Sequence, residues 1–181
     1  MVAIMPDDAK TSGASLVTVS SGGMKSKPVY MPAAPASPGI YSMNRLGFSQ
    51  GYILNRDGTL NSPSNPASEG DPITIFATGV GPVTEVGPYA VTALAGSVFV
   101  DGFYARGIAA YLRRVPGLPG YVYEISVFVP RPSDFAARNP NLTDFKLPPQ
   151  VPVMLVLGEV NRANPAWSAM RSQDGIALSV H

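Results

Sequence analysis

The sequence predicts an all-β protein: an immunoglobulin-like β-sandwich preceded by three strands of an incomplete second sandwich. Apolar and polar residues alternate over short windows such as 72–78 and 121–129, which is the period of a strand with one buried face. Turn signals, among them Asp57-Gly58 and Asp101-Gly102, separate these windows at short intervals. No long window keeps the spacing of an amphipathic helix free of Gly and Pro, so helices contribute little.

Taken in order along the chain, the apolar windows predict a series of short strands. They lie near residues 2–5, 15–20, 27–31, 39–42, 50–55, 72–78, 96–100, 103–112, 121–129, 151–158 and 175–180. One short helix is expected from Pro132 to Arg138. Within 72–78, Phe76 falls on the outer face, opposite the core positions. The positions that we expect to be buried are Ile73, Ile75, Val98, Val100, Ile125, Val127, Val129, Leu155 and Leu157.

The first 32 residues read as the end of a unit that the rest of the chain repeats in full. Both regions show a strand, a proline, a second strand, a turn and a third strand, and internal repeats of this kind define modules. We therefore assign 1–32 to a partial immunoglobulin-like module with C-terminal strands only. Residues 33–38 are a Pro-rich linker. Residues 39–181 form a complete sandwich with insertions at 131–150 and 161–174, and long insertions are often functional.

Composition excludes several classes of function. The 13 basic and 12 acidic residues are scattered singly, so no basic stripe points to nucleic acid. A net charge of +1 leaves little self-repulsion to oppose association. The absence of cysteine excludes disulfides and thiolate metal sites. No apolar run approaches the roughly 18–20 residues of a membrane-spanning helix.

Several segments resemble a known family. They are Ala36-Ser37-Pro38-Gly39-Ile40-Tyr41, Gln50-Gly51-Tyr52-Ile53-Leu54-Asn55-Arg56-Asp57-Gly58, Gly70-Asp71-Pro72-Ile73-Thr74-Ile75-Phe76-Ala77-Thr78-Gly79-Val80-Gly81-Pro82 and Val115-Pro116-Gly117-Leu118-Pro119-Gly120. Together they are similar to the immunoglobulin-like C-terminal module of acidobacterial (Solibacter-type) secreted proteins. The resemblance covers about 1–130 well and 150–181 weakly, and it departs in the long insertion 131–150. It implies a fold and an extracellular or cell-surface location, with no activity attached.

No enzymatic activity and no cofactor are expected. The only histidine is His181, at a terminus that is expected to fray, and no nucleophile or zinc motif is present. The carboxylates close in sequence, Asp7-Asp8 and Glu69 with Asp71, fall in loops. Residues 55–61 carry oxygen ligands at alternate positions, as calcium loops do, but lack the closing glutamate. A hydrogen-bonded turn explains them better, so no metal is expected.

The main hypothesis is a non-enzymatic extracellular structural module that self-associates through unpaired β-strands, as a filament or surface-layer subunit. Half a sandwich leaves an apolar face and strand edges open, which invites head-to-tail pairing with another chain. The candidate self-association residues are Val2, Ile4, Leu16, Val17, Val19, Val29 and Tyr30. The simpler alternative is that residues 1–32 fold back onto the sandwich of the same chain.

Two other interpretations stay open at this stage. One is an adhesion or carbohydrate-binding module of a larger secreted protein, since exposed rings can stack on sugars. Its candidate ligand face consists of Tyr104, Tyr111, Tyr121, Tyr123 and Trp167. The other is a fragment of a longer multi-domain protein, whose partners would be neighbouring domains. The expected partner is therefore a second copy or a neighbouring domain, with carbohydrate as the alternative.

Overall fold

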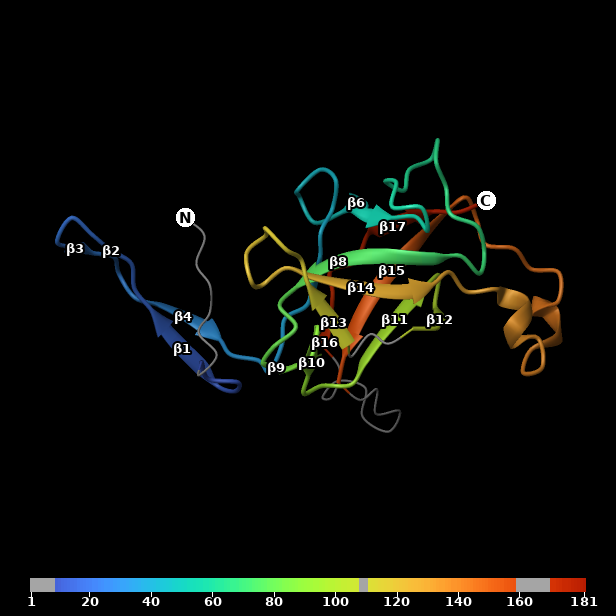
Figure 1. Cartoon of the computed structure of the whole chain (residues 1–181). Coiled ribbons are helices and arrows are strands. Elements are labelled where there is room, and N and C mark those ends of the chain that lie inside the picture. The colour runs from blue at the N-terminus through green and yellow to red at the C-terminus, as the bar shows by residue number, and fades with distance from the viewer. Residues whose placement is uncertain (1–8, 108–110, 159–169) are drawn as a thin grey trace.

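The computed structural model describes residues 9–107, 111–158 and 170–181. Within these residues, two β-sheets face each other, and a hairpin projects from one end of the sandwich (Figure 1). The secondary structure is almost entirely strand, which confirms the all-β sandwich that the sequence predicts. We call the projecting hairpin, residues 14–32, the arm.

The first sheet is antiparallel and contains seven strands. Its order is β5 (Gly39–Ile40), β8 (Pro72–Thr78), β14 (Tyr123–Phe128), β13 (Tyr111–Arg114), β10 (Tyr89–Thr92) and β9 (Val83–Val86), with β7 (Ile53–Leu54) also paired to β8.

The second sheet has the order β12 (Phe103–Ala105), β11 (Gly96–Val100), β15 (Gln150–Leu157), β17 (Ile176–Ser179) and β6 (Ser49–Gln50), with β16 (Met170–Arg171) also paired to β15. Strands β17 and β6 run parallel. Apart from β9 and β10 in the first sheet and β6 in the second, the strand order is similar to the A-B-E-D and C′-C-F-G arrangement of immunoglobulin-like sandwiches.

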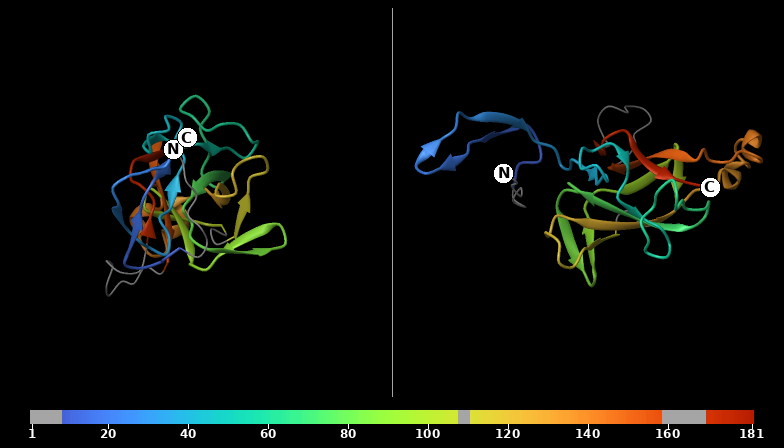
Figure 2. Two further views of the ribbon diagram at one scale, coloured as in Figure 1. Left: turned by 90° about the vertical axis from the view of Figure 1, so that its left-hand side faces the viewer. Right: turned by 90° about the horizontal axis from the view of Figure 1, so that it is seen from above.

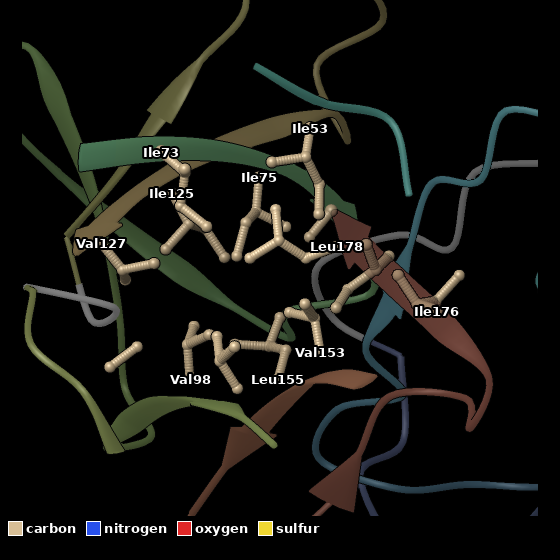
Figure 3. Packing of buried hydrophobic residues seen from close by; sticks show 14 of the residues in the cluster. Ile53, Ile73, Ile75, Val98, Ile125, Val127, Val153, Leu155, Ile176 and Leu178 are labelled. Atoms are coloured by element: carbon tan, nitrogen blue, oxygen red, sulfur yellow. The ribbon is translucent and has the colours of Figure 1, made fainter. Parts of the chain in front are cut away.

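The core lies between the two sheets. Ile73, Ile75 and Ile125 point from the first sheet toward Val98 and Leu155 of the second (Figure 3). All nine positions predicted to be buried are buried, so the alternation in the sequence sets the register correctly.

The arm is a two-stranded hairpin with a break in the middle. Strand β1 (Ala14–Val17) pairs with β4 (Val29–Pro32), and β2 (Ser20–Ser21) pairs with β3 (Met24–Lys25). Gly22 and Gly23, both with positive φ, form the turn, as a two-residue hairpin loop requires. Among the described residues, the arm pairs only with itself, so residues 14–32 do not fold back onto the sandwich. The strand expected at 2–5 lies outside the described residues.

Several elements differ from the sequence prediction. The strand expected at 103–112 is wrong: β12 and β13 belong to different sheets, because the chain crosses between the sheets there. The hairpin β9–β10 occupies 83–92, where no strand was expected, and it pairs with β13. In the insertion 131–150 the expected helix is a short 3₁₀ turn, η1 (Pro132–Phe135), followed by η2 (Pro140–Leu142).

The second half of the linker packs against the sandwich. Ala36 and Pro38 are buried, and the backbone N–H of Ser37 donates to the carbonyl oxygen of Gly79. A Cβ on Gly79 would lie against the Ser37 carbonyl, so this close approach requires glycine. The arm is therefore attached to the sandwich at a fixed point, beside the end of β8.

Candidate functional site

The arm exposes apolar side chains on both of its faces. Leu16 and Tyr30 are directly opposite each other on one face, and Val17 and Val29 on the other. Tyr30 is 77% exposed, Val29 59% and Leu16 55%. An isolated hairpin is at best marginally stable in water, whereas three or more strands with a covered face are stable. These side chains therefore form an uncovered apolar surface on a hairpin that has no third strand among the described residues.

The five described candidates for self-association all belong to the arm. Leu16, Val29, Tyr30 and Val19 are exposed, and Val17 is half-buried. Val2 and Ile4 lie outside the described residues. The structure thus brings the five together on one projecting element.

A serine gives the arm the same local geometry as the last hairpin of the sandwich. The N–H of Ser26 donates to the carbonyl oxygen of Val19 at 2.8 Å, and the N–H of Val19 donates to Ser26 Oγ at 3.0 Å. In the sandwich, Ser172 makes the same two bonds with Leu155, also at 2.8 and 3.0 Å. In both hairpins this serine pair lies next to a break in the strand ladder. The arm therefore has the form of the hairpin that carries β15, β16 and β17.

The two hairpins differ in the size and polarity of the side chains at matching positions. Matching Ser26 to Ser172 and Val19 to Leu155 places Ser15 at the position of Val151 and Ser21 at that of Leu157. Val151 and Leu157 are fully buried in the core. The arm is therefore the more polar and less bulky of the two hairpins.

A second apolar surface lies beside the base of the arm. It is a hollow of about 560 Å³, which is within the usual size range of binding pockets. Its lining is dominated by rings and aliphatic side chains. The lining residues are Tyr41, Ser42, Met43, Arg45, Tyr52, Phe76, Leu118, Pro119, Tyr121 and Val122. We call this the apolar hollow.

The walls of the apolar hollow are held by aromatic packing. Tyr52 meets Phe76 edge to face, with ring centroids 5.3 Å apart, a favoured geometry for aromatic pairs. Burial raises the pKa of Tyr41, while a hydrogen bond with Thr78 lowers it by less. Tyr41 is therefore a neutral phenol at physiological pH and contributes an uncharged wall.

The loop that forms the rim is fixed by its own hydrogen bonds. Ser42 Oγ accepts from the N–H of Gly47 and donates to Asn44 Oδ1, which also accepts from the N–H of Leu46. Arg45 is held at a φ of 59°, a conformation that non-glycine residues rarely adopt. The rim is thus a structured loop that presents Met43 and Arg45 to solvent.

Of the five residues predicted as a carbohydrate face, the structure describes the side chains of Tyr104, Tyr121 and Tyr123, and these three do not lie on one face. Tyr123 is buried in β14 with the Arg114 guanidinium over its ring, while Tyr104 is exposed on β12 of the opposite sheet. Tyr121 lines the apolar hollow. Tyr104 and Tyr123 therefore belong to opposite sheets, and Tyr121 lies outside β14. Tyr111 belongs to β13 by its backbone, and Trp167 lies outside the described residues.

The residues that resemble a calcium loop are used in hydrogen bonds. Asp57 Oδ1 accepts from the N–H and Oγ1 of Thr59, which lowers the pKa of that carboxyl. Asn61 is fully buried: its Nδ2 donates to Asn55 Oδ1 and to the Ser179 carbonyl oxygen. Asn61 Oδ1 accepts from Gln50 Nε2 and the Ser179 N–H. These residues tie the 55–61 loop to β17, and among the described residues no cluster of metal-ligand side chains occurs.

The single histidine is more ordered than the sequence suggests. His181 donates its backbone N–H to the Ala67 carbonyl oxygen, and its Nε2 lies 3.0 Å from Ser68 Oγ. A serine beside a histidine is the start of a nucleophile and base pair, but catalysis also needs a group that orients the base and a pocket for substrate. The nearby carboxylates are otherwise used: Glu69 accepts from the N–H of Leu147, and Asp71 from that of Ser68. The pair closes the chain end onto the sandwich.

No helix in the described part of the chain is long and apolar enough to cross a membrane. Comparisons with protein families, with curated proteins and with solved structures gave no match for this chain.

Proposed function

We propose that this chain is a non-enzymatic structural module of an extracellular assembly, and that its arm joins it to a second copy. The observation that carries the proposal is the projecting arm, whose apolar side chains are exposed on both faces. The extracellular location rests on the resemblance to the Solibacter-type secreted modules.

The energetics favour association through the arm. Burial of apolar surface contributes about 25 cal/mol per Å², so covering a few hundred Å² of the arm contributes several kcal/mol. A partner strand would also pair the open edges of β1 and β4, as in strand addition. The net charge of +1 opposes this only weakly.

The hydrogen bonds of three carboxylates are also consistent with a structural role. Asp57, Glu69 and Asp71 accept hydrogen bonds from nearby backbone N–H groups. Among the described residues of the adhesion alternative, Tyr104, Tyr121 and Tyr123 do not share one face, which favours the structural role.

Charged substitutions in the arm test the proposal. In Leu16→Lys/Tyr30→Lys, each new ammonium would have to be desolvated in the interface, so the variant should sediment as a monomer at concentrations where the parent associates. The matched control is Val86→Lys/Tyr104→Lys, since Val86 and Tyr104 are exposed apolar residues on the sandwich. Equal association of parent and arm variant in analytical ultracentrifugation would remove the proposal.

A further inference from the structure

We propose that the apolar hollow of one copy receives Leu16 and Tyr30 from the arm of a second copy, and that the exchange is reciprocal. The inference rests on the proposed function and names the surface on which the arm docks. A reciprocal contact of this kind gives a closed two-fold dimer. The sequence alone led us to expect a head-to-tail contact instead.

The arm and the apolar hollow lie at the same end of the sandwich. The linker connects the arm to the sandwich, and the N–H of Ser37 in this linker donates a hydrogen bond to the carbonyl oxygen of Gly79, just after β8. Tyr41 follows within a few residues, and its N–H donates to the carbonyl oxygen of Phe76 in β8. Seen from above, the segment that follows the linker lies between the arm and the body of the sandwich (Figure 2). A second copy approaching this end therefore meets both surfaces at once.

The exposed apolar side chains of the described residues are concentrated at this end. Six of them belong to the arm, five to the apolar hollow or to the loop at its rim, and the remaining five to other parts of the sandwich. On the arm they are Leu16, Val19, Met24, Val29, Tyr30 and Met31; Met43, Tyr52 and Leu118 line the hollow, and Leu46 and Phe48 belong to the loop that continues from Met43. Large clustered patches of this kind mark interaction sites, whereas single exposed apolar residues do not.

The chemistry of the two surfaces matches. Leu16 and Tyr30 are directly opposite each other on one face of the arm, and we call this apolar pair the knob. The hollow that would receive them has aromatic and aliphatic walls. Lys25 and Lys27 lie toward the turn of the arm, away from this knob. Arg45, which forms no ion pair within the described residues, would lie at the rim beside the incoming Tyr30 ring, where a guanidinium is attracted to the ring face.

Exchange of the arm for the last hairpin of the partner's sandwich is the other way to bury it, and packing opposes it. The arm would place Ser15 and Ser21 where Val151 and Leu157 are fully buried. Replacing large apolar side chains by small ones in a close-packed core leaves cavities and is strongly unfavourable. The arm therefore docks on an outer surface of a complete sandwich.

Symmetry follows from this placement. When the same end of each copy carries both the arm and the hollow, each arm reaches the hollow of the other copy across a two-fold axis. Such an isologous contact uses all of its surfaces and closes at two copies. The expected particle has twice the chain mass of 19.0 kDa.

Cross-linking tests the contact directly, because the chain contains no cysteine of its own. Two single variants, Tyr30→Cys and Leu118→Cys, are purified, mixed and treated with a short thiol-to-thiol cross-linker. A cross-linked dimer containing one chain of each variant is expected. The matched control replaces Leu118→Cys with Val86→Cys, a residue of nearly equal exposure (51% against 50%), and should give no such product.

A charge variant separates this inference from the proposed function. Leu118→Asp should weaken dimerisation about tenfold or more, as expected for a residue buried at an interface centre, while Val86→Asp should not. If the arm variant is monomeric but Leu118→Asp still dimerises normally and the mixed cross-link is absent, the arm docks elsewhere and this inference is wrong, while the proposed function stands. A hollow that instead shifts the NMR signals of Tyr52 and Tyr121 on addition of oligosaccharides, with dimerisation unaffected, is a glycan site and also overturns it. A parent chain that is monomeric throughout removes both.

Discussion

Ser26 and Val19 are joined by a pair of hydrogen bonds that the chain uses twice. The side-chain oxygen of Ser26 accepts a hydrogen bond from the N–H of Val19. The carbonyl oxygen of Val19 accepts one from the N–H of Ser26. Ser172 and Leu155 repeat this arrangement in the sandwich. In one hairpin the serine is exposed, and in the other it is buried. The same pair of hydrogen bonds should therefore contribute more to the free energy of unfolding at buried Ser172 than at exposed Ser26.

This difference gives a prediction for two equivalent substitutions. Ser172→Ala should lower the free energy of unfolding by about 1–3 kcal/mol, because it leaves the buried N–H of Leu155 without its acceptor. Ser26→Ala should change it little, since water replaces the lost bond on the exposed arm. Urea denaturation of both variants measures the two effects. Equal losses would mean that the arm and the sandwich unfold as one cooperative unit.

Asn61 should be among the most sensitive polar positions. Asn61→Ala removes the partners of Gln50, Asn55 and Ser179 at a fully buried site, so a loss of about 2–4 kcal/mol is expected. The control is Asn141→Ala, at an exposed position. Thermal unfolding followed by calorimetry compares them. A loss no greater than that of the control would show that water satisfies the groups around Asn61.

The core register can be tested at two neighbouring residues. Ile125→Ala should lower the free energy of unfolding by about 2–5 kcal/mol, the usual effect of truncating a buried branched side chain. Ser126→Ala, on the exposed face of the same strand, should have an effect within about 0.5 kcal/mol. The reverse order of the two effects in chemical denaturation would contradict the register of β14.

The loop at Asp57 predicts a local dependence on pH. Thr59 donates to the Asp57 carboxylate through Oγ1 and N–H, and these bonds hold its pKa below the ordinary value. A lowered pKa in the folded state stabilises the loop above the unfolded pKa, and this contribution is lost as the pH falls through the folded pKa. Thr59→Val removes the hydroxyl, so the pKa of Asp57 should rise toward its ordinary value in an NMR titration. An unchanged pKa would assign the shift to the backbone N–H instead.

Alternation in the sequence was enough to predict the sandwich and its core. Ile73, Ile75 and Ile125 lie where a period of two places them, because one face of each strand is buried. The strand expected at 103–112 failed because apolar alternation does not say when a chain leaves one sheet for the other. The hairpin at 83–92 was missed, although Gly87-Pro88 between two short apolar windows is a turn signal that could have revealed it.

The candidate site was only half predictable. The exposed arm follows from unpaired strands near the N-terminus, and Leu16 and Tyr30 were among the expected residues. The apolar hollow was not expected as a site, since Tyr41, Tyr52 and Leu118 are far apart in sequence and meet only in the folded chain. Phe76, predicted on the outer face of its strand, was the one signal that this surface is apolar.

Native mass measurement on the full chain and on a variant lacking residues 1–32 tests the central claim most directly. The sandwich of the variant should remain folded, as shown by circular dichroism, because the described part of the arm forms no ladder with it. The full chain is expected at twice 19.0 kDa and the variant as a monomer at the same concentration. A variant that associates as well as the full chain would contradict the account.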